Sequence, residues 1–259
     1  MKITILGSGT FLPDTSRHCS SYLFEVGENK LIFDFGRGAI NSLIQKKIDL
    51  KEIRHVFISH LHADHFSEIS SFLAWLIDEP SLLQVEHRVI IYGPVGLKDA
   101  VGKLLDAFQI SSKLPRRPAG RIEIVEINSG ETAAVCGLLI QGLEVDHSQG
   151  RDDFKALSFR ITHDTKIVCY SGDTPLCEGI RAAVRDADLA IVEATLPKEK
   201  RVDTHMNGED LGVLAKEENI KKLIVTHIDK SYLGRVEEDI RKNYPGELLI
   251  AQDLMEIVV

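Results

Sequence analysis

Six consecutive residues, His60-Leu61-His62-Ala63-Asp64-His65, place three imidazoles and one carboxylate in one short segment. They follow Val56 to Ser59, an apolar run that predicts a buried strand. In an extended loop alternate side chains point the same way, so His60 and His62 can bind one cation while Asp64 and His65 turn towards a second. Imidazole nitrogen and carboxylate oxygen suit zinc and neighbouring first-row ions. The segment therefore predicts two metal ions, with further ligands from elsewhere in the chain.

Three further candidate ligands stand just after apolar, β-branched runs that predict strands: His147, Asp173 and His227. Ligands at strand ends are held by a rigid scaffold and remain open to substrate. An ordinary surface or core histidine is the alternative interpretation of His147 or His227 taken alone. A chance H-x-H-x-D-H is rare, so the ordered set favours a metal site.

This order of parts resembles the metallo-β-lactamase-fold hydrolases: H-x-H-x-D-H, a lone His, the turn Ser171-Gly172-Asp173-Thr174, and a second lone His. The match runs from the Met1 to Gly9 segment to the last strand and covers nearly the whole chain. The resemblance implies two ligand sets joined by a bridging Asp173: His60, His62 and His147 for one metal, and Asp64, His65 and His227 for the other. It implies two divalent ions, with zinc expected and manganese and iron as alternatives.

Apolar or alternating runs predict strands over Ile3–Leu6, Tyr22–Val26, Leu31–Phe33, Val56–Ser59, Val89–Tyr92, Ile122–Ile127, Leu138–Val145, Leu157–Ile161, Ile167–Tyr170, Leu189–Val192, Leu223–Val225 and Met255–Val258. Amphipathic segments predict helices over Asp64–Ile77, Val95–Phe108, Pro175–Arg185, Gly208–Glu218 and Gly234–Asn243. Periodicity alone indicates only layered α and β structure. The resemblance implies an α/β, four-layer αββα sandwich, the metallo-β-lactamase fold, with the metals along one open edge.

Asp173 is expected at a turn from a strand into a helix. Pro175 fits the first helical position, and Thr174 before it fits the N-cap. A helix that begins there would fix the position of the bridging carboxylate through the backbone.

Paired divalent ions can generate hydroxide near neutral pH and polarise a phosphoryl or carbonyl oxygen. The metals thus indicate hydrolysis without specifying the bond. Glu193 ends the predicted strand that begins at Leu189, and His205 stands just before a helix that Asn207 would cap. A carboxylate that orients a His and stabilises its protonated form makes a general acid, which an alkoxide leaving group needs.

In ribonuclease Z and its small phosphodiesterase relatives, a Glu and a His at these two places form such a pair. The resemblance therefore implies a catalytic set of Asp64, which is also a ligand, with Glu193 and the general acid His205. A plain surface carboxylate would also account for Glu193, and ordinary polarity at a helix start would account for His205. Arg17 and His18 could reach a substrate phosphate, with a solvated loop as the alternative.

The chain departs from ribonuclease Z in one respect that affects the substrate. That family inserts a Gly- and Pro-rich arm between the lone ligand His and the bridging Asp to grip tRNA, whereas here only a loop, Ser148 to Phe154, and a hairpin separate His147 from Asp173. The formal net charge of -8 also argues against a broad polyanion-binding surface. A small phosphodiester substrate is expected, such as a cyclic nucleotide or cyclic ribose phosphate, and extended nucleic acid is not.

Several other functions stay open. The runner-up is a ribonuclease Z-type tRNA 3' endonuclease. Hydrolysis of a C–O, C–N or thioester bond is a further enzymatic alternative, although strong leaving groups need no general acid. A non-catalytic carrier or sensor that keeps the metal ligands is the alternative from a different class.

With 259 residues, 44% hydrophobic composition and no Pro- or Ser-rich linker, the chain is expected to form one hydrolase domain over residues 1–259. Neither a signal peptide nor a membrane-spanning run is expected, which favours the cytoplasm and no membrane partner. The four cysteines show no C-x-x-C spacing and are expected to be free thiols. A homodimer is compatible with the sequence.

Overall fold

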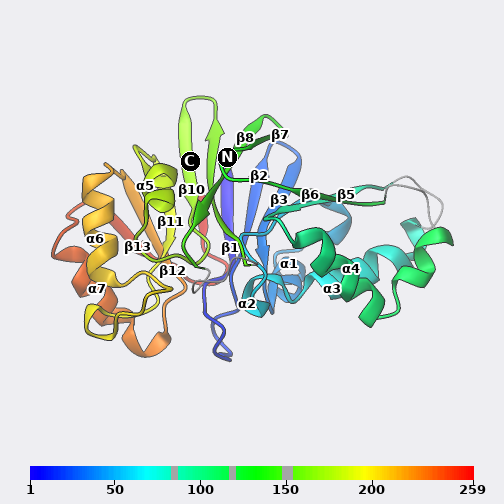
Figure 1. The fold of residues 1–259 in the computed structure, drawn as a ribbon, viewed down its shortest axis with the longest axis horizontal. Helices are drawn as coiled ribbons and strands as arrows, with labels where there is room; N and C mark the ends of the chain where they lie inside the picture. The colour runs from blue at the N-terminus through cyan, green and yellow to red at the C-terminus, as the bar shows by residue number, and fades with distance from the viewer. Residues whose placement is uncertain (83–86, 117–120, 148–153) are drawn as a thin grey trace.

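The computed structural model describes residues 1–82, 87–116, 121–147 and 154–259. In that part of the chain, two seven-stranded sheets pack face to face, and helices cover the outer face of each (Figure 1). The predicted α/β, four-layer αββα sandwich is therefore confirmed.

The first sheet has the strand order β14-β1-β2-β3-β4-β5-β6. Its strands, in chain order, are β1 (Lys2–Gly7), β2 (Ser21–Val26), β3 (Asn29–Phe35), β4 (Ile53–Phe57), β5 (Val89–Gly93), β6 (Ile122–Glu126) and β14 (Glu256–Val258). The helices on its outer side are α1 (Ala39–Gln45), α2 (Ala63–Phe66), α3 (Ile69–Asp78) and α4 (Leu97–Ala107).

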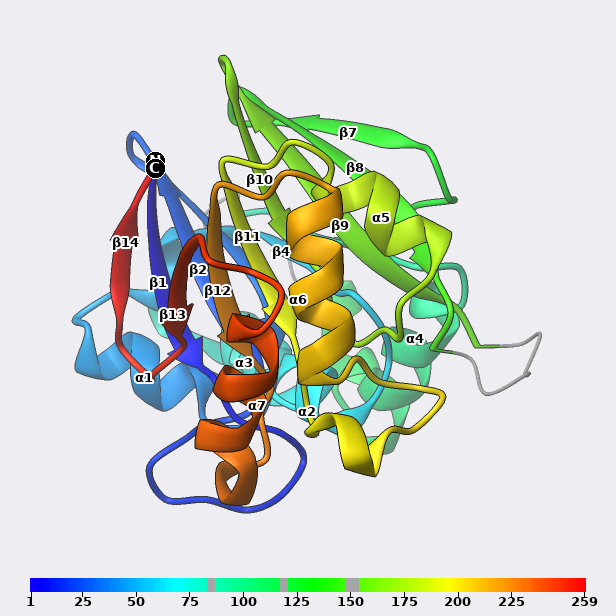
Figure 2. The ribbon, with the colours of Figure 1, turned by 90° about the vertical axis from the view of Figure 1, so that its left-hand side faces the viewer.

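The second sheet has the order β13-β12-β11-β10-β9-β8-β7. Its strands are β7 (Thr132–Val135), β8 (Leu138–Val145), β9 (Ala156–His163), β10 (Lys166–Tyr170), β11 (Leu189–Glu193), β12 (Lys222–Thr226) and β13 (Glu247–Ile250). The helices α5 (Glu178–Val184), α6 (Gly208–Glu217) and α7 (Leu233–Arg241) lie in front of this sheet in Figure 2.

Within the described ranges, three apolar clusters hold the four layers together. The central one lies between the sheets and is rich in aromatic rings, among them Phe33, Phe57 and Phe159. A second joins the first sheet to α1, α3 and α4, and a third joins the second sheet to α5, α6 and α7. Strands with apolar residues on both faces are expected for a sheet that is covered on both sides.

The direction of the strands decides where the candidate ligands meet. β3, β4 and β5 run parallel in the first sheet, and β10, β11 and β12 run parallel in the second. β8 pairs antiparallel with β9, which pairs antiparallel with β10, so β8 runs in the direction of β10. The segments that follow β4, β8, β10, β11 and β12 carry the candidate residues from both sheets to one edge.

Among the described residues, the helix α1, the strands β7 and β13 and the short 3-10 helices were not predicted from the sequence. β7 is a four-residue strand with two alanines, and β13 is a four-residue strand at the sheet edge. Runs this short carry too few residues to establish a period. Their pairing with β8 and β12 supplies the hydrogen bonds that a local pattern does not indicate.

The predicted helix over 64–77 is wrong as a single element, because it is divided into α2 and α3 around Glu68. The Glu68 N–H donates to the carbonyl of Phe35 in β3 (3.0 Å) rather than to a carbonyl of the preceding turn. Its carboxylate accepts hydrogen bonds from the N–H groups of Gly38 and Ile40, both 2.6 Å. These long-range contacts take precedence over the helical period.

The predicted helix start at Pro175 is also wrong, and so is Thr174 as its N-cap. α5 begins at Glu178 with Cys177 as N-cap residue. The Thr174 N–H donates to Glu193 Oε1 (2.9 Å), and its hydroxyl donates to the Pro175 carbonyl (2.7 Å). The segment after Asp173 is thus held by the hydrogen bond from Thr174 to Glu193 of β11, and not by a helical turn.

The four cysteines are free, as predicted. Within the described residues, no helix combines the length and the apolar character needed to cross a membrane.

Candidate metal centre

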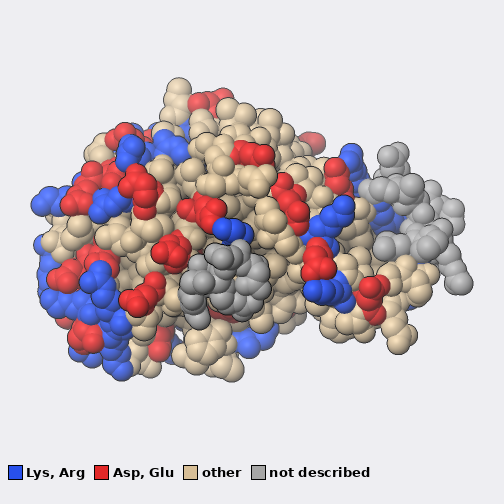
Figure 3. Space-filling model, in the orientation of Figure 1, with Lys and Arg blue, Asp and Glu red and all other residues tan. Residues whose placement is uncertain are grey.

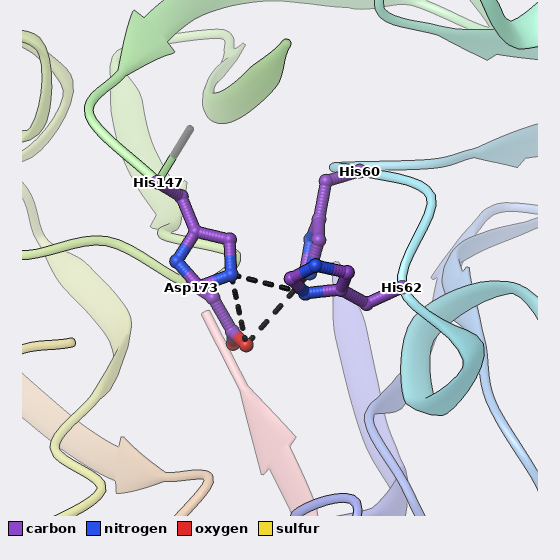
Figure 4. Close-up of side chains that lie close together, drawn as sticks. All are labelled: His60, His62, His147 and Asp173. Carbon is purple, nitrogen blue, oxygen red and sulfur yellow. Dashed lines mark hydrogen bonds and ion pairs between the residues drawn. The ribbon is translucent and has the colours of Figure 1, made fainter. Parts of the chain in front are cut away.

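The first ligand group brings together residues from three separate strand ends. His60 and His62 follow β4, His147 follows β8 and Asp173 follows β10, and one nitrogen or oxygen of each lies within 4.8 Å of the others. Figure 4 shows the three rings and the carboxylate turned towards a common centre. His147 Nε2 is 3.1 Å from His62 Nδ1, and Asp173 Oδ2 is 3.8 Å from His60 Nε2. Four N and O donors around one point suit a tetrahedral cation.

The second group shares Asp173 with the first and adds Asp64, His65 and His227, again within 4.8 Å of one another. Asp64 Oδ2 lies 3.2 Å from His227 Nε2, and Asp173 Oδ1 lies 3.2 Å from His65 Nε2. His227 adopts a left-handed backbone conformation (φ 51°), which is uncommon outside glycine. Its N–H donates to the Ser8 carbonyl (3.1 Å), and this contact fixes the ring beside Asp64.

Buried polar atoms in these groups lack hydrogen bonds among the described residues, although His65 Nε2 and Asp173 Oδ1 lie 3.2 Å apart as an ion pair. Within the described residues, His60 Nε2, His65 Nε2 and Asp173 Oδ1 are buried and make no hydrogen bond. An unsatisfied buried polar atom costs about 1–3 kcal/mol. Cations bound between the rings and the carboxylates would satisfy all three atoms, so the residues present fit a pair of divalent metal ions.

The electrostatics of the two groups also suit cations. Burial lowers the pKa of His60 well below its usual value, so that ring is neutral and its lone pair is available. Burial opposes the charge on His65, but Asp173 and Asp34 raise its pKa well above the usual range. The positive charge that these carboxylates stabilise on His65 is the charge that a metal ion would supply in its place.

The orientation of three imidazoles, those of His147, His227 and His60, is set from the far side of each ring. His147 Nδ1 donates to the Thr204 carbonyl (2.6 Å), and His227 Nδ1 is 2.9 Å from Thr195 Oγ1. His60 Nδ1 is 3.0 Å from Ser59 Oγ. A ring nitrogen held in this way leaves the opposite nitrogen, Nε2, free to face the centre.

Asp34 is a candidate site residue that the sequence analysis missed. It is fully buried near the end of β3 with φ 55°, and its carboxylate accepts hydrogen bonds from Ser59 N–H (2.6 Å) and from Ser59 Oγ (2.7 Å). His65 Nδ1 lies 2.6 Å from the same carboxylate, which therefore aims His65 Nε2 at Asp173. Tyr170 OH donates to it as well. An acidic residue inside the apolar run Leu31-Ile32-Phe33-Asp34-Phe35 was the signal that could have identified it.

We expect Asp34→Asn to weaken metal binding by roughly 10- to 100-fold, because it removes the charge that orients His65. The measurement is metal content after dialysis against graded chelator. Asp239→Asn is the matched control, since Asp239 is also a buried carboxylate with hydrogen-bonded oxygens but contacts no candidate ligand. Equal metal retention by both variants would remove Asp34 from the site.

Glu193 and His205 form a second buried pair beside both groups. Glu193 is fully buried, so the alternative of a plain surface carboxylate is wrong. Its Oε1 accepts from the Thr174 N–H and lies 2.9 Å from His205 Nδ1. Its Oε2 accepts from the N–H and the hydroxyl of Thr195, at 3.1 and 2.8 Å. Burial lowers the pKa of His205, but the negative charge of Glu193 more than offsets this and raises that pKa to about 9.

Among the residues that the structure describes, two other clusters contain enough ligand atoms for a metal: Asp34, His60 and His65, and Glu193, His205 and His227. In both, the carboxylate is already engaged by protein donors, from Ser59 in one case and from Thr174 and Thr195 in the other. The unpartnered atoms lie instead on the side of Asp173. These two carboxylates are therefore better suited to orient histidines than to hold ions.

Arg17 does not reach the site, contrary to the sequence hypothesis. It is buried, and its guanidinium donates to the carbonyls of Ser8 and Ala251, both 3.0 Å. His18 lies 2.8 Å from Ser42 Oγ through Nδ1. Arg17 is thus buried against the backbone rather than in a solvated loop, whereas His18 is half-buried and packs against Ser42.

A family model described as a β-lactamase superfamily domain matches residues 32–228. Ribonuclease Z of Methanosarcina acetivorans is 26% identical over 100% of this chain and 98% of that protein. Among solved structures, the metallo-β-lactamase fold protein YhfI from Bacillus subtilis superposes with a TM-score of 0.81, 22% identity and 99% coverage of both chains. A diphosphatase from the PhnP family gives a TM-score of 0.73 at 17% identity, over 100% of this chain and 97% of that one.

Proposed function

The chain belongs to the β-lactamase superfamily and is a metal-dependent hydrolase, and from that premise we propose that it is a phosphodiesterase that cleaves small phosphodiesters, cyclic ones included. Residues 1–259 would act as one hydrolase domain. The proposal has three parts: two metal positions, a general acid beside them, and a substrate that is small.

The two metal positions are assigned to the two ligand groups. His60, His62 and His147 would hold one ion, Asp64, His65 and His227 the other, and Asp173 would contact both. Zinc suits these nitrogen and oxygen donors, and manganese or iron are alternatives. When bound, two divalent ions supply a water-derived nucleophile near neutral pH and stabilise negative charge on a phosphoryl oxygen.

The contact between Glu193 and His205 is the observation that carries the phosphodiesterase proposal. His205 Nδ1–H donates to Glu193 Oε1, which leaves the proton on Nε2 for the leaving oxygen. The negative charge of Glu193, which raises the pKa of His205, favours the protonated ring. The His205 ring also lies beside those of His147 and His227, with centroids 4.9 and 5.6 Å apart. A proton donor at this place is needed for an alkoxide leaving group.

A small substrate is supported by chain length and charge. The alignment with the Methanosarcina ribonuclease Z spans 312 positions, whereas this chain has 259 residues, so that relative contains segments that this chain lacks. The loop Ser148 to Phe154, where the sequence leaves no room for a tRNA-gripping arm, lies outside the described residues except for Phe154. On the face in Figure 3, acidic and basic side chains are interspersed.

Ribonuclease Z-type cleavage of tRNA is the second candidate, because the ribonuclease Z of Methanosarcina acetivorans matches along the whole chain. The same metal positions and the same general acid would serve both reactions. The two candidates differ in substrate size only.

The test is turnover across a panel of cyclic nucleotides, linear dinucleotides, precursor tRNA, and lactam or thioester compounds, with added Zn²⁺ or Mn²⁺. Hydrolysis confined to phosphodiesters is expected. Preferred hydrolysis of a lactam or thioester would contradict the phosphodiesterase proposal, and no turnover of any compound would favour a non-catalytic metal protein.

We expect precursor tRNA to be a weak substrate at near-physiological salt, because a net charge of -8 disfavours polyanion binding. The measurement compares kcat/KM for precursor tRNA with that for a linear dinucleotide at the same ionic strength. Efficient cleavage at the tRNA 3' end would reverse the ranking of the two candidates.

A further inference from the structure

A pocket of about 350 Å³ adjoins the candidate metal centre on the side of Asp64. Phe11 and Arg37 line it together with Asp64 and Glu68. None of the roles assigned above uses Phe11 or Arg37. Both are exposed, and Phe11 shows 66% of its surface to solvent.

Arg37 places an exposed positive charge at this pocket. Its side chain makes no hydrogen bond or ion pair with any residue that the structure describes. The carboxylate of Glu68 is engaged by the N–H groups of Gly38 and Ile40, and that of Asp64 faces His227. An exposed guanidinium beside a phosphodiesterase centre is suited to bind a phosphate through paired hydrogen bonds.

Phe11 offers a flat apolar surface at the same pocket. It lies in the loop after β1, which closes through the bond from Gly9 N–H to the His18 carbonyl (2.7 Å). The Cys19 thiol donates to the Thr10 carbonyl (3.2 Å) and holds the start of that loop. In Figures 1 and 2 this loop, in dark blue, projects on the side of the molecule where α2 lies. An exposed aromatic ring in a held loop can stack on a nucleobase.

The backbone brings Phe11 and Arg37 to one pocket. β1 and β3 both pair antiparallel with β2, so the segments that follow them reach the same edge. The Arg37 carbonyl accepts from the Cys19 N–H (3.0 Å), which ties the two segments together. A Cβ on Gly36 would lie 2.0 Å from the Asp64 carbonyl oxygen, so only glycine allows this close approach to the metal centre.

We propose that this pocket is a nucleotide subsite, in which Phe11 stacks on the base next to the scissile diester and Arg37 binds a second, non-scissile phosphate. The inference rests on the proposed function and narrows it to small phosphodiesters that carry a base and an additional phosphate.

The test compares two dinucleotides that differ by one phosphate, TpT and its 5'-phosphorylated form pTpT. The wild-type enzyme is expected to prefer pTpT in kcat/KM by roughly 10- to 100-fold, the range for a charge-assisted hydrogen-bonded pair. Arg37→Ala should abolish that preference, mainly through KM, and Arg37→Lys should retain part of it. Arg54→Ala is the matched control, because Arg54 is also exposed but lies at the start of β4, the end of that strand away from His60.

Phe11→Ala should lower kcat/KM for TpT roughly 10-fold, as expected for loss of one stacked base. Methyl p-nitrophenyl phosphate, which has no base, should be affected much less. Equal losses on the two substrates would contradict stacking by Phe11.

Binding of thymidine 3',5'-bisphosphate, measured by calorimetry, separates the subsite from the catalytic function. We expect Arg37→Ala to weaken this binding at least 10-fold relative to wild type. If the enzyme hydrolyses diesters but Arg37→Ala changes neither the pTpT preference nor bisphosphate binding, the subsite proposal is wrong. Bisphosphate binding that depends on Arg37, without turnover of any diester, supports the subsite and contradicts the proposed function.

Discussion

His205→Ala should keep its metal ions yet lose roughly 10²- to 10⁴-fold in rate on a diester with an alkyl or ribose leaving group. The reason is that His205, held by Glu193 at 2.9 Å, is placed to protonate the leaving oxygen. On bis(p-nitrophenyl) phosphate, whose leaving group departs as a stable anion, the loss should be much smaller. Glu193→Gln should follow the same pattern more mildly. The measurement is kcat on both substrates together with metal content.

His163→Ala is the matched control for this prediction, because His163 is also partly buried but lies in the hairpin between β9 and β10. It should change neither rate. Equal losses on both substrates, or loss of metal from His205→Ala, would refute the general acid and make His205 a ligand or a positioning group.

The pH profile gives an independent check of the same residue. The protonated form of His205 is the active one, so the rate on an alkyl diester should fall as pH rises through the pKa of His205. That pKa is raised to about 9 by Glu193, and cations bound nearby lower it because they repel the protonated ring. The alkaline decline is therefore expected at or below about pH 9, and it should be absent in His205→Ala.

Asp173→Ala should be more damaging than loss of any ligand that belongs to one group only. Its two oxygens face His60 and His65, one in each ligand group, and its negative charge offsets the mutual repulsion of two dications. We expect metal content to fall at both positions and activity to be lost. Elemental analysis of the purified variant measures this directly.

His62→Ala and His227→Ala are the comparison variants, because each residue belongs to only one of the two groups that share Asp173. Each should lower the metal content mainly at one position. Full metal content and activity in Asp173→Ala would contradict the role of Asp173 as a ligand shared by both groups. A single ion that remains bound after loss of Asp64, His65 and His227 would contradict the assignment of two metal ions.

Local spacing allowed the candidate ligands to be identified without a structure. His60, His62, Asp64 and His65 lie within six residues, so covalent geometry keeps them close in any compact fold. The lone His147, Asp173 and His227 each follow an apolar run, and buried strands leave that pattern in a sequence. The structure brings these residues together in two groups. Periodicity indicated only layered α and β structure, and the family resemblance supplied the four-layer αββα arrangement.

Contacts between distant segments were decided only by the tertiary structure. The contact of Asp34 with His65 is visible only once β3 packs beside β4, because the two residues are 31 positions apart in the sequence. The same holds for Glu193: the sequence left a plain surface carboxylate open as the alternative, and burial with hydrogen bonds from Thr174 and Thr195 excludes it. Sequence patterns report which side chains avoid water, whereas the partners of a buried polar group depend on how the layers pack. The helix break at Glu68 and the meeting of Arg37 and Asp64 at one pocket follow from that packing, and no local period encodes them.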